Sequence, residues 1–278
     1  MPFKDILVHV DGGKHMEARL ETAFALATAH TAHVVGLYVR STPYVPQFIK
    51  AQFGPEVIEI QRRYMAEAVE TAEKRFVHHA TLAGIPYEWR VVDGDVVDQV
   101  NLHARYADLT VIGQPDPETQ EANDHREVAD HLILDAGRPV LVVPYAGRFP
   151  TLGTRVMVAW NGSREATRAV NDAIPLLQLA KHVEVMAINP RGGLNGHGDV
   201  PGADITLHLA RHDVKAQADH LHAEDMDVGN MLLSRISDGE IDLLVMGAYG
   251  RSRLRELVMG GATRHILRHM TVPVMMSH

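Results

Sequence analysis

The sequence predicts an α/β protein built as two tandem open parallel five-stranded sheets, with helices on both faces of each. Three short segments of the first half recur in the same order in the second half. The matches pair residues 6–12 (ILVHVDG) with 156–162 (VMVAWNG), 107–113 (ADLTVIG) with 241–247 (IDLLVMG), and 138–142 (RPVLV) with 272–276 (VPVMM). The spacing of 26 residues from Gly113 to Pro139 also recurs from Gly247 to Pro273. Such repetition indicates a duplicated structural unit.

Strand-like and helix-like stretches alternate within each half, as in the βαβ units that form parallel sheets. The strands are short apolar runs of buried-strand character. In the first half they are expected at residues 4–10, 33–39, 87–92, 108–113 and 139–143, with helices at 15–30, 55–83, 95–105 and 122–136. In the second half they are expected at 154–160, 183–188, 215–221, 242–247 and 273–277, with helices at 164–180, 203–212, 227–237 and 260–270.

Residues 146–153 (AGRFPTLG) have the composition of a short linker between the two copies. We therefore expect an amino-terminal domain at residues 1–146 and a carboxy-terminal domain at 153–278. The strands at 139–143 and 273–277 end their copies. They could pair within one chain, between two chains as a homodimer, or both.

Composition limits the function classes. The net charge of −8, with no lysine or arginine block, argues against a nucleic-acid or membrane surface. The absence of cysteine excludes a disulfide framework, a thiolate metal site and cysteine catalysis, and it fits a reducing compartment. Without an export signal or an apolar run of about 18 residues, we expect a soluble cytoplasmic protein.

Ligands of open parallel sheets bind beyond the carboxyl ends of the strands. Asp11 and Asn161 follow the first strand of each copy, and Gly113 and Gly247 end the fourth. In the second copy, Gly247 begins the spacing G-x2-G-x9-G, which continues to Gly250 and Gly260 and is followed by a predicted helix. Glycines allow backbone N–H groups to approach anionic oxygens, and a helix amino terminus adds free donors. Phosphate is the ligand that this pattern favours.

Four arginines surround the loop and could add charge-assisted contacts, and Thr263 could donate its hydroxyl. These arginines are Arg251, Arg253, Arg255 and Arg264. A plainer interpretation is that the arginines form a solvated face and that the glycines only shape a turn.

Over nearly its whole length the chain resembles the universal stress protein family. The resemblance is most specific at residues 247–252 (GAYGRS) together with Gly260, because nucleotide-binding members carry G-x2-G-x9-G-[S/T]. It implies five-stranded units that pair in tandem or dimerise and, in one subset, hold ATP, with or without Mg²⁺, beside this loop. The implied nucleotide-binding residues are Asn161, Gly162, Ile188, Gly247, Gly250, Arg251, Gly260, Gly261, Ala262 and Thr263.

The second copy departs from the family pattern at two positions. Gly261 stands at the Ser/Thr position, and Asn161 replaces the usual aspartate. Gly261 still presents a backbone N–H, and the amide of Asn161 can still hydrogen-bond an adenine or ribose. ATP binding in a stress-response module is therefore the leading hypothesis. The alternative is a structural or interaction protein that has lost nucleotide binding, and a metal-dependent hydrolase is a third.

The first copy departs further. Asp116, Arg126 and Glu127 stand where the second copy has Gly250, Gly260 and Gly261, and Asp116 would place a carboxylate where phosphate should lie. We interpret this copy as a partner with a remnant site at Asp11, Gly12 and Gly113.

No convincing catalytic set is present, so at most slow ATP hydrolysis is expected. The pairs His208/His212 and His265/His269 have helical i, i+4 spacing but lack the H-E-x-x-H pattern, so no metal site is predicted. The glycine-rich segment 191–199 follows a predicted strand, and we hypothesise that it is a lid over the Gly247 loop.

Overall fold

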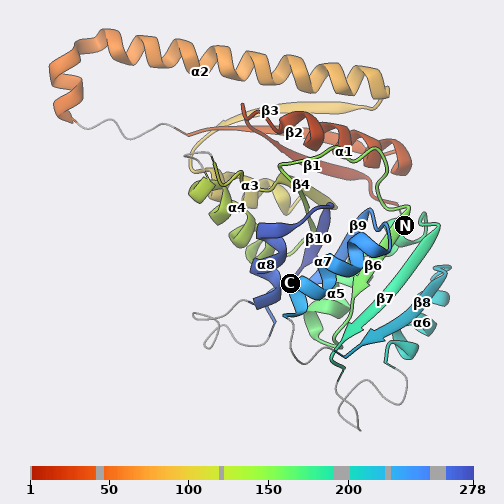
Figure 1. Cartoon of the computed structure of the whole chain (residues 1–278). Helices are drawn as coiled ribbons and strands as arrows, with labels where there is room; N and C mark the ends of the chain where they lie inside the picture. Colours follow the sequence, from red (N-terminus) through yellow and green to blue (C-terminus); the bar gives the residue numbers. More distant parts are fainter. Residues whose placement is uncertain (1, 42–46, 119–121, 191–200, 223–226, 251–260) are drawn as a thin grey trace.

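The computed structural model describes residues 2–41, 47–118, 122–190, 201–222, 227–250 and 261–278. Strands and helices alternate through both copies (Figure 1). The first copy contains β1 (Asp5–Val10), α1 (Met16–His30), β2 (His33–Arg40), α2 (Gln47–Ala83), β3 (Tyr87–Asp93), α3 (Val96–Ala104), β4 (Leu109–Gly113), α4 (Ala122–Asp135) and β5 (Val140–Val143). The second contains β6 (Arg155–Ala159), α5 (Arg164–Leu177), β7 (His182–Ile188), α6 (Ala203–Ala210), β8 (Ala216–Leu221), α7 (Val228–Asp238), β9 (Leu243–Gly247), α8 (Gly261–His269) and β10 (Val274–Ser277).

The chain forms the predicted α/β fold with parallel strands inside each copy, but the two copies share one sheet. Across the described residues, the strand order of this ten-stranded sheet is β3-β2-β1-β4-β5-β10-β9-β6-β7-β8. The join is an antiparallel pairing of β5 with β10, in which Leu141 faces Met275. The expectation of two separate five-stranded sheets is corrected accordingly. Both joining strands are buried apolar segments, and pairing them removes two exposed edges.

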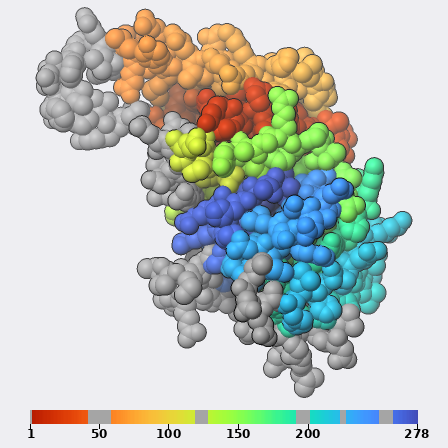
Figure 2. Space-filling model, in the orientation of Figure 1, coloured from red at the N-terminus to blue at the C-terminus, as the bar shows by residue number. Residues whose placement is uncertain are grey.

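Each face of the sheet is covered by its own apolar layer. Along β1, Ile6 and Val8 face one layer and Leu7 faces the other, as the side-chain period of a strand requires. Helices α1, α2, α5 and α6 cover the first layer, and helices α3, α4, α7 and α8 cover the second. Figure 2 shows the end of the first copy, in light green, packed directly against the end of the second copy, in dark blue.

Helix α2 is longer than the sequence predicted. It begins at Gln47 and not at residue 55, and it runs along the outside of β2 and β3 (Figure 1). The other element boundaries differ from the predicted ones by a few residues, which is the usual uncertainty at helix ends. Every helix in the described ranges is too short or too polar to cross a membrane.

Candidate functional site

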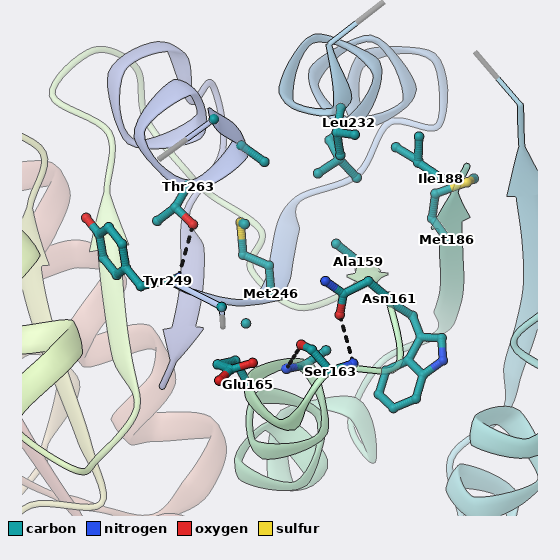
Figure 3. Close-up of a pocket in the computed structure, with 17 residues that line it drawn as sticks. Ala159, Asn161, Ser163, Glu165, Met186, Ile188, Leu232, Met246, Tyr249 and Thr263 are labelled. Atoms are coloured by element: carbon teal, nitrogen blue, oxygen red, sulfur yellow. Dashed lines mark hydrogen bonds between the residues drawn. The ribbon is translucent and has the colours of Figure 1, made fainter. Parts of the chain in front are cut away.

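The second copy contains a cavity of about 270 Å³ at the carboxyl ends of β6, β7 and β9. Strands β6 and β9 are neighbours, and the chain leaves them toward opposite sides of the sheet, so the cavity lies where the strand order reverses. Ligands of open parallel sheets bind at this kind of position. The amino-terminal ends of α5, α7 and α8 surround the opening (Figure 3).

One wall of the cavity is apolar. Met186 and Ile188 contribute from β7 and Leu232 from α7, and these three lie on one side in Figure 3, while Met246 from β9 lies between them and Thr263. Leu232 and Met246 are buried, so their side chains are held by the core that lies beneath them. A wall of this composition suits a flat ring with little charge.

The opposite wall begins at the turn from β6 into α5. The Asn161 Oδ1 atom accepts a hydrogen bond from the Ser163 backbone N–H (3.0 Å), and the Ser163 hydroxyl oxygen accepts from Ala166 N–H (3.1 Å) as the cap of α5. Gly162 between them has a φ of 68°. The side-chain N–H₂ of Asn161 has no hydrogen-bond partner among the described residues, so a ligand can accept from it.

Gly247 allows the loop after β9 to touch the first turn of α5. A Cβ atom on Gly247 would lie 2.4 Å from both the backbone nitrogen of Ala166 and the carbonyl carbon of Glu165. Such distances do not occur in real structures, so this position requires glycine. Among the described residues, the nearest atom to a Cβ on Gly250 or Gly261 would be 3.6 Å or 3.9 Å away, respectively. Gly247 is thus required by packing against α5, whereas Gly250 and Gly261 line the cavity without side chains that would narrow it.

The start of α8 closes the polar side of the cavity. Gly261, Ala262 and Thr263 line it, and backbone N–H groups in a first helical turn have no partner within their own helix. The Thr263 hydroxyl oxygen accepts a 3.4 Å hydrogen bond from the Tyr249 backbone N–H. Tyr249 has a φ of 52°, which is uncommon for a residue other than glycine.

Tyr249 also connects the cavity to the first copy. Its hydroxyl donates a hydrogen bond to the Asp130 carboxylate on α4. One residue therefore lines the cavity through its loop and contacts the other copy through its side chain.

Glu165 is a functional candidate that the sequence did not reveal. It lies in the first turn of α5, lines the cavity and is only 3% exposed. Its Oε1 atom is 3.4 Å from the guanidinium of exposed Arg164, and its Oε2 atom has no hydrogen-bond partner in the described parts of the chain. An acidic residue in a first turn is common, because it favours the helix dipole, so its identity alone gave no signal of a site.

Seven of the implied nucleotide-binding residues line this one cavity. They are Asn161, Ile188, Gly247, Gly250, Gly261, Ala262 and Thr263. Gly162 lies in the turn beside it. Arg251 and Gly260 fall outside the described residues, as do Arg253, Arg255 and the segment 191–199 that we hypothesised to be a lid. Arg264 is exposed on α8 and belongs to a different cleft, between the two copies.

Arg19 occupies the corresponding region of the first copy. Its guanidinium pairs with Asp11 (2.9 Å), donates to the carbonyl oxygen of His9 (2.6 Å), and would lie 2.8 Å from a Cβ atom on Gly113. Gly12 has open space beside it. The side chain of Arg19 therefore takes the room between the two strand ends where the remnant site was expected.

Asp116 has its own cations in the first copy. Its carboxylate lies 2.8 Å from the Lys14 ammonium and 2.9 Å from His15 Nε2, and it accepts from Glu118 N–H at 3.0 Å. The hydrogen bond from Lys14 is the main cause that holds the pKa of Asp116 far below its ordinary value. Asp116 thus supplies an internal anion at this loop.

The two histidines of each predicted pair lie close together. The ring centroids are 4.7 Å apart in His208/His212 and 4.5 Å apart in His265/His269. Within the described ranges, no group of three or more histidine or carboxylate side chains could hold a metal ion.

The model of the universal stress protein family matches the chain twice, at residues 2–144 and 154–278. Universal stress protein Slr1230 of Synechocystis sp. (strain ATCC 27184 / PCC 6803 / Kazusa) is 27% identical over 172 residues, or 60% of this chain. The match spans 57% of that relative, which is less than two thirds of its length.

Two solved structures share the whole fold. A universal stress protein from Archaeoglobus fulgidus DSM 4304 has a TM-score of 0.73 and 15% identity, with 98% of this chain and 97% of that chain covered. A functionally unknown protein from Pseudomonas aeruginosa PAO1 has a TM-score of 0.59 and 13% identity, with 99% and 92% covered. At these identities the likeness concerns the fold.

Proposed function

Because the chain belongs to the universal stress protein family, we propose that it is a nucleotide-responsive stress-response module whose second copy binds ATP. The observation that carries this proposal is the cavity beside the G-x2-G loop, which has an apolar wall at one side and two helix amino termini at the other. Adenine nucleotides have the same division between a flat ring and a phosphate chain.

The apolar wall would hold the base. Met186, Ile188 and Leu232 offer contact surface for an adenine ring, and the free N–H₂ of Asn161 would donate to a ring nitrogen or a ribose oxygen. An aspartate at this position would only accept hydrogen bonds, whereas Asn161 both donates and accepts them. A polar side chain is therefore kept at this position.

The amino terminus of α8 would hold the phosphates. Backbone N–H groups of Gly261, Ala262 and Thr263 point from a first helical turn, where the helix dipole favours negative charge. These donors belong to the backbone, so the absence of a hydroxyl at Gly261 does not remove them. Thr263 lies two positions further on and supplies a hydroxyl at the cavity wall.

The module would act by binding and not by catalysis. The described cavity wall contains one carboxylate, Glu165, and no histidine or lysine that would complete an acid–base pair. Nucleotide bound in the cavity would affect the first copy through Tyr249, whose hydroxyl contacts Asp130 of that copy. At most slow, incidental hydrolysis is expected.

A second candidate function is a structural or interaction protein without nucleotide. Glu165 favours it, because a buried carboxylate beside Gly250 would repel a free polyphosphate. In the first copy, the side chains of Arg19 and Asp116 occupy the corresponding site, which also favours a protein that binds no nucleotide.

Titration calorimetry with Mg-ATP separates the two candidates. The wild type should give a saturable heat, and Gly250→Asp, which places the first copy's carboxylate in the second copy's loop, should weaken binding at least tenfold, or about 1.4 kcal/mol. Gly12→Asp is the matched control, because Gly12 lies in open space in the remnant site, and it should bind as the wild type does. A wild type that gives no heat would refute ATP binding.

We further propose that the protein acts in the cytoplasm and that it associates as a homodimer. The absence of cysteine supports the first point, and the resemblance described above, which implies units that pair in tandem or dimerise, supports the second. Cell fractionation and a solution mass measurement test them, and a monomer mass at micromolar concentration would contradict the second.

A further inference from the structure

Both copies place a carboxylate where the loop after the fourth strand meets the first helix. In the first copy the carboxylate is Asp116 on the loop, facing His15 at the helix start. In the second copy the corresponding positions are Gly250 and Glu165. The Glu165 Oε2 atom lies 3.6 Å from the point where a Cβ on Gly250 would stand. The carboxylate has therefore moved from loop to helix but occupies the same junction.

The two carboxylates differ in their cations. Asp116 has the Lys14 ammonium at 2.8 Å and His15 Nε2 at 2.9 Å. Glu165 has only the guanidinium of Arg164, which is 3.4 Å from Oε1 and whose side chain is 76% exposed, and Oε2 has no partner among the described residues. A buried carboxylate that lacks a counter-charge is costly, and the helix dipole offsets only part of that cost. Among the described residues, the junction of the second copy therefore has no buried cation like those around Asp116.

A bound polyphosphate would increase this deficit. The phosphates would lie between the start of α8 and the start of α5, and Glu165 stands beside Ser163 on the α5 side (Figure 3). The described wall of the cavity contains no lysine, arginine or histidine. A hard divalent cation removes both problems, because it takes oxygen ligands from a carboxylate and from phosphates at once.

We propose that Glu165 is the protein ligand of a divalent cation of the Mg²⁺ class that enters the cavity together with the nucleotide's phosphates. This inference rests on the proposed binding of ATP. It makes the metal complex, and not the free nucleotide, the species that the second copy selects. The buried carboxylate, which repels free ATP, becomes an attractive group once the cation is present.

The test is calorimetry of ATP with Mg²⁺ and of ATP with EDTA on three proteins: wild type, Glu165→Gln and Asp172→Asn. Asp172 is the matched control, because it is a carboxylate on the same helix that pairs with Arg168 at 2.7 Å outside the cavity. The wild type and Asp172→Asn should bind Mg-ATP at least tenfold more tightly than metal-free ATP. In Glu165→Gln this ratio should fall below about threefold, because Mg-ATP binds less well and metal-free ATP binds better.

Electron paramagnetic resonance with Mn²⁺ gives a second measurement. At saturating ATP, the wild type should immobilise one Mn²⁺ per chain, and the Mn²⁺ spectrum should differ in Glu165→Gln. If Glu165→Gln does not fold by circular dichroism, Glu165→Asp replaces it. That variant withdraws the carboxylate by one methylene and should reduce the metal preference at least threefold.

Three results overturn the inference. An unchanged Mg²⁺ preference in the Glu165 variant would show that the phosphates alone hold the cation. Equal binding of ATP with and without metal by the wild type would show that other groups supply the counter-charge. In both cases the proposed ATP binding stands. Absence of binding under both conditions overturns the proposed function, and this inference with it.

Discussion

Replacement of Gly247 by alanine is the sharpest test of how the loop and α5 fit together. The added methyl carbon would lie 2.4 Å from the Ala166 nitrogen and from the Glu165 carbonyl carbon. To reach an ordinary contact, the first turn of α5 must move by about 1 Å away from the loop. Overpacking of this kind costs about 1–3 kcal/mol. We expect the upper end, about 3 kcal/mol, because the opposing atoms are backbone and cannot rotate away.

Urea unfolding followed by circular dichroism measures this cost. Gly250→Ala and Gly261→Ala are the controls, since their methyl groups would stand 3.6 Å and 3.9 Å from the nearest atom of the described residues. Both should stay within about 0.5 kcal/mol of the wild type, as surface substitutions do. If Gly247→Ala loses less than about 1 kcal/mol, the close contact between loop and helix is not a feature of the folded protein.

Three further predictions concern polar contacts. Tyr249→Phe removes the hydroxyl that donates to Asp130 and should lower the unfolding free energy by about 1–2 kcal/mol; in a double-mutant cycle with Asp130→Asn, additive losses would contradict the contact. Burial lowers the pKa of His30 below 6.5, so the unfolded chain takes up a proton first and stability should fall as the pH drops below about 6.5; the free-energy difference between wild type and His30→Gln, measured from pH 5 to 8, should change with pH and not stay constant. The pKa of Asp116 is lowered from its ordinary value of 3.8, so the ionised carboxylate stabilises the fold at pH values above 3.8, and this stabilisation is lost as the pH falls below 3.8. The unfolding free energies of wild type and Asp116→Asn, measured against pH, should therefore converge below pH 3.8. Curves that remain parallel would count against the ion pair with Lys14.

The fold and the position of the site follow from local signals in the sequence. Repeated segments such as 107–113 and 241–247 identify the strands, because a buried parallel strand needs a short apolar run. The glycine and polar residues after these runs point to the carboxyl edge of the sheet, and the cavity lies there. Rules about periodicity and strand ends are sufficient for this much.

The join between the copies depends on distant residues and is not written in any one segment. Strands β5 and β10 were recognisable, but an apolar strand of four residues pairs equally well in several ways. Which partner it takes is decided by the packing of the two whole copies. The contact between Tyr249 and Asp130, separated by 119 residues, follows from that packing and was therefore beyond sequence reasoning.

Glu165 was missed for a related reason. Its place in the first turn of α5 is ordinary, since acidic residues favour the start of a helix. It is buried because Gly247 lets the loop after β9 lie directly on that turn. The glycine was assigned a role toward phosphate, whereas its closest neighbour is protein backbone. Because Gly247 was interpreted only as a phosphate-binding residue, its packing against the first turn of α5, which buries Glu165, was not predicted.

The two copies differ in the charges that lie where the loop after the fourth strand meets the first helix. In the first copy, Asp116 pairs with Lys14 and Arg19 pairs with Asp11. These charged groups therefore have partners of opposite charge within the protein itself. The second copy has Gly250 in place of Asp116, and its carboxylate, Glu165, has no buried cation beside it among the residues that the structure describes. Since both copies share one sheet, the first copy can supply a rigid support for the second. If the proposed binding holds, duplication lets one half keep a buried carboxylate at its junction while the other half maintains the stability of the fold.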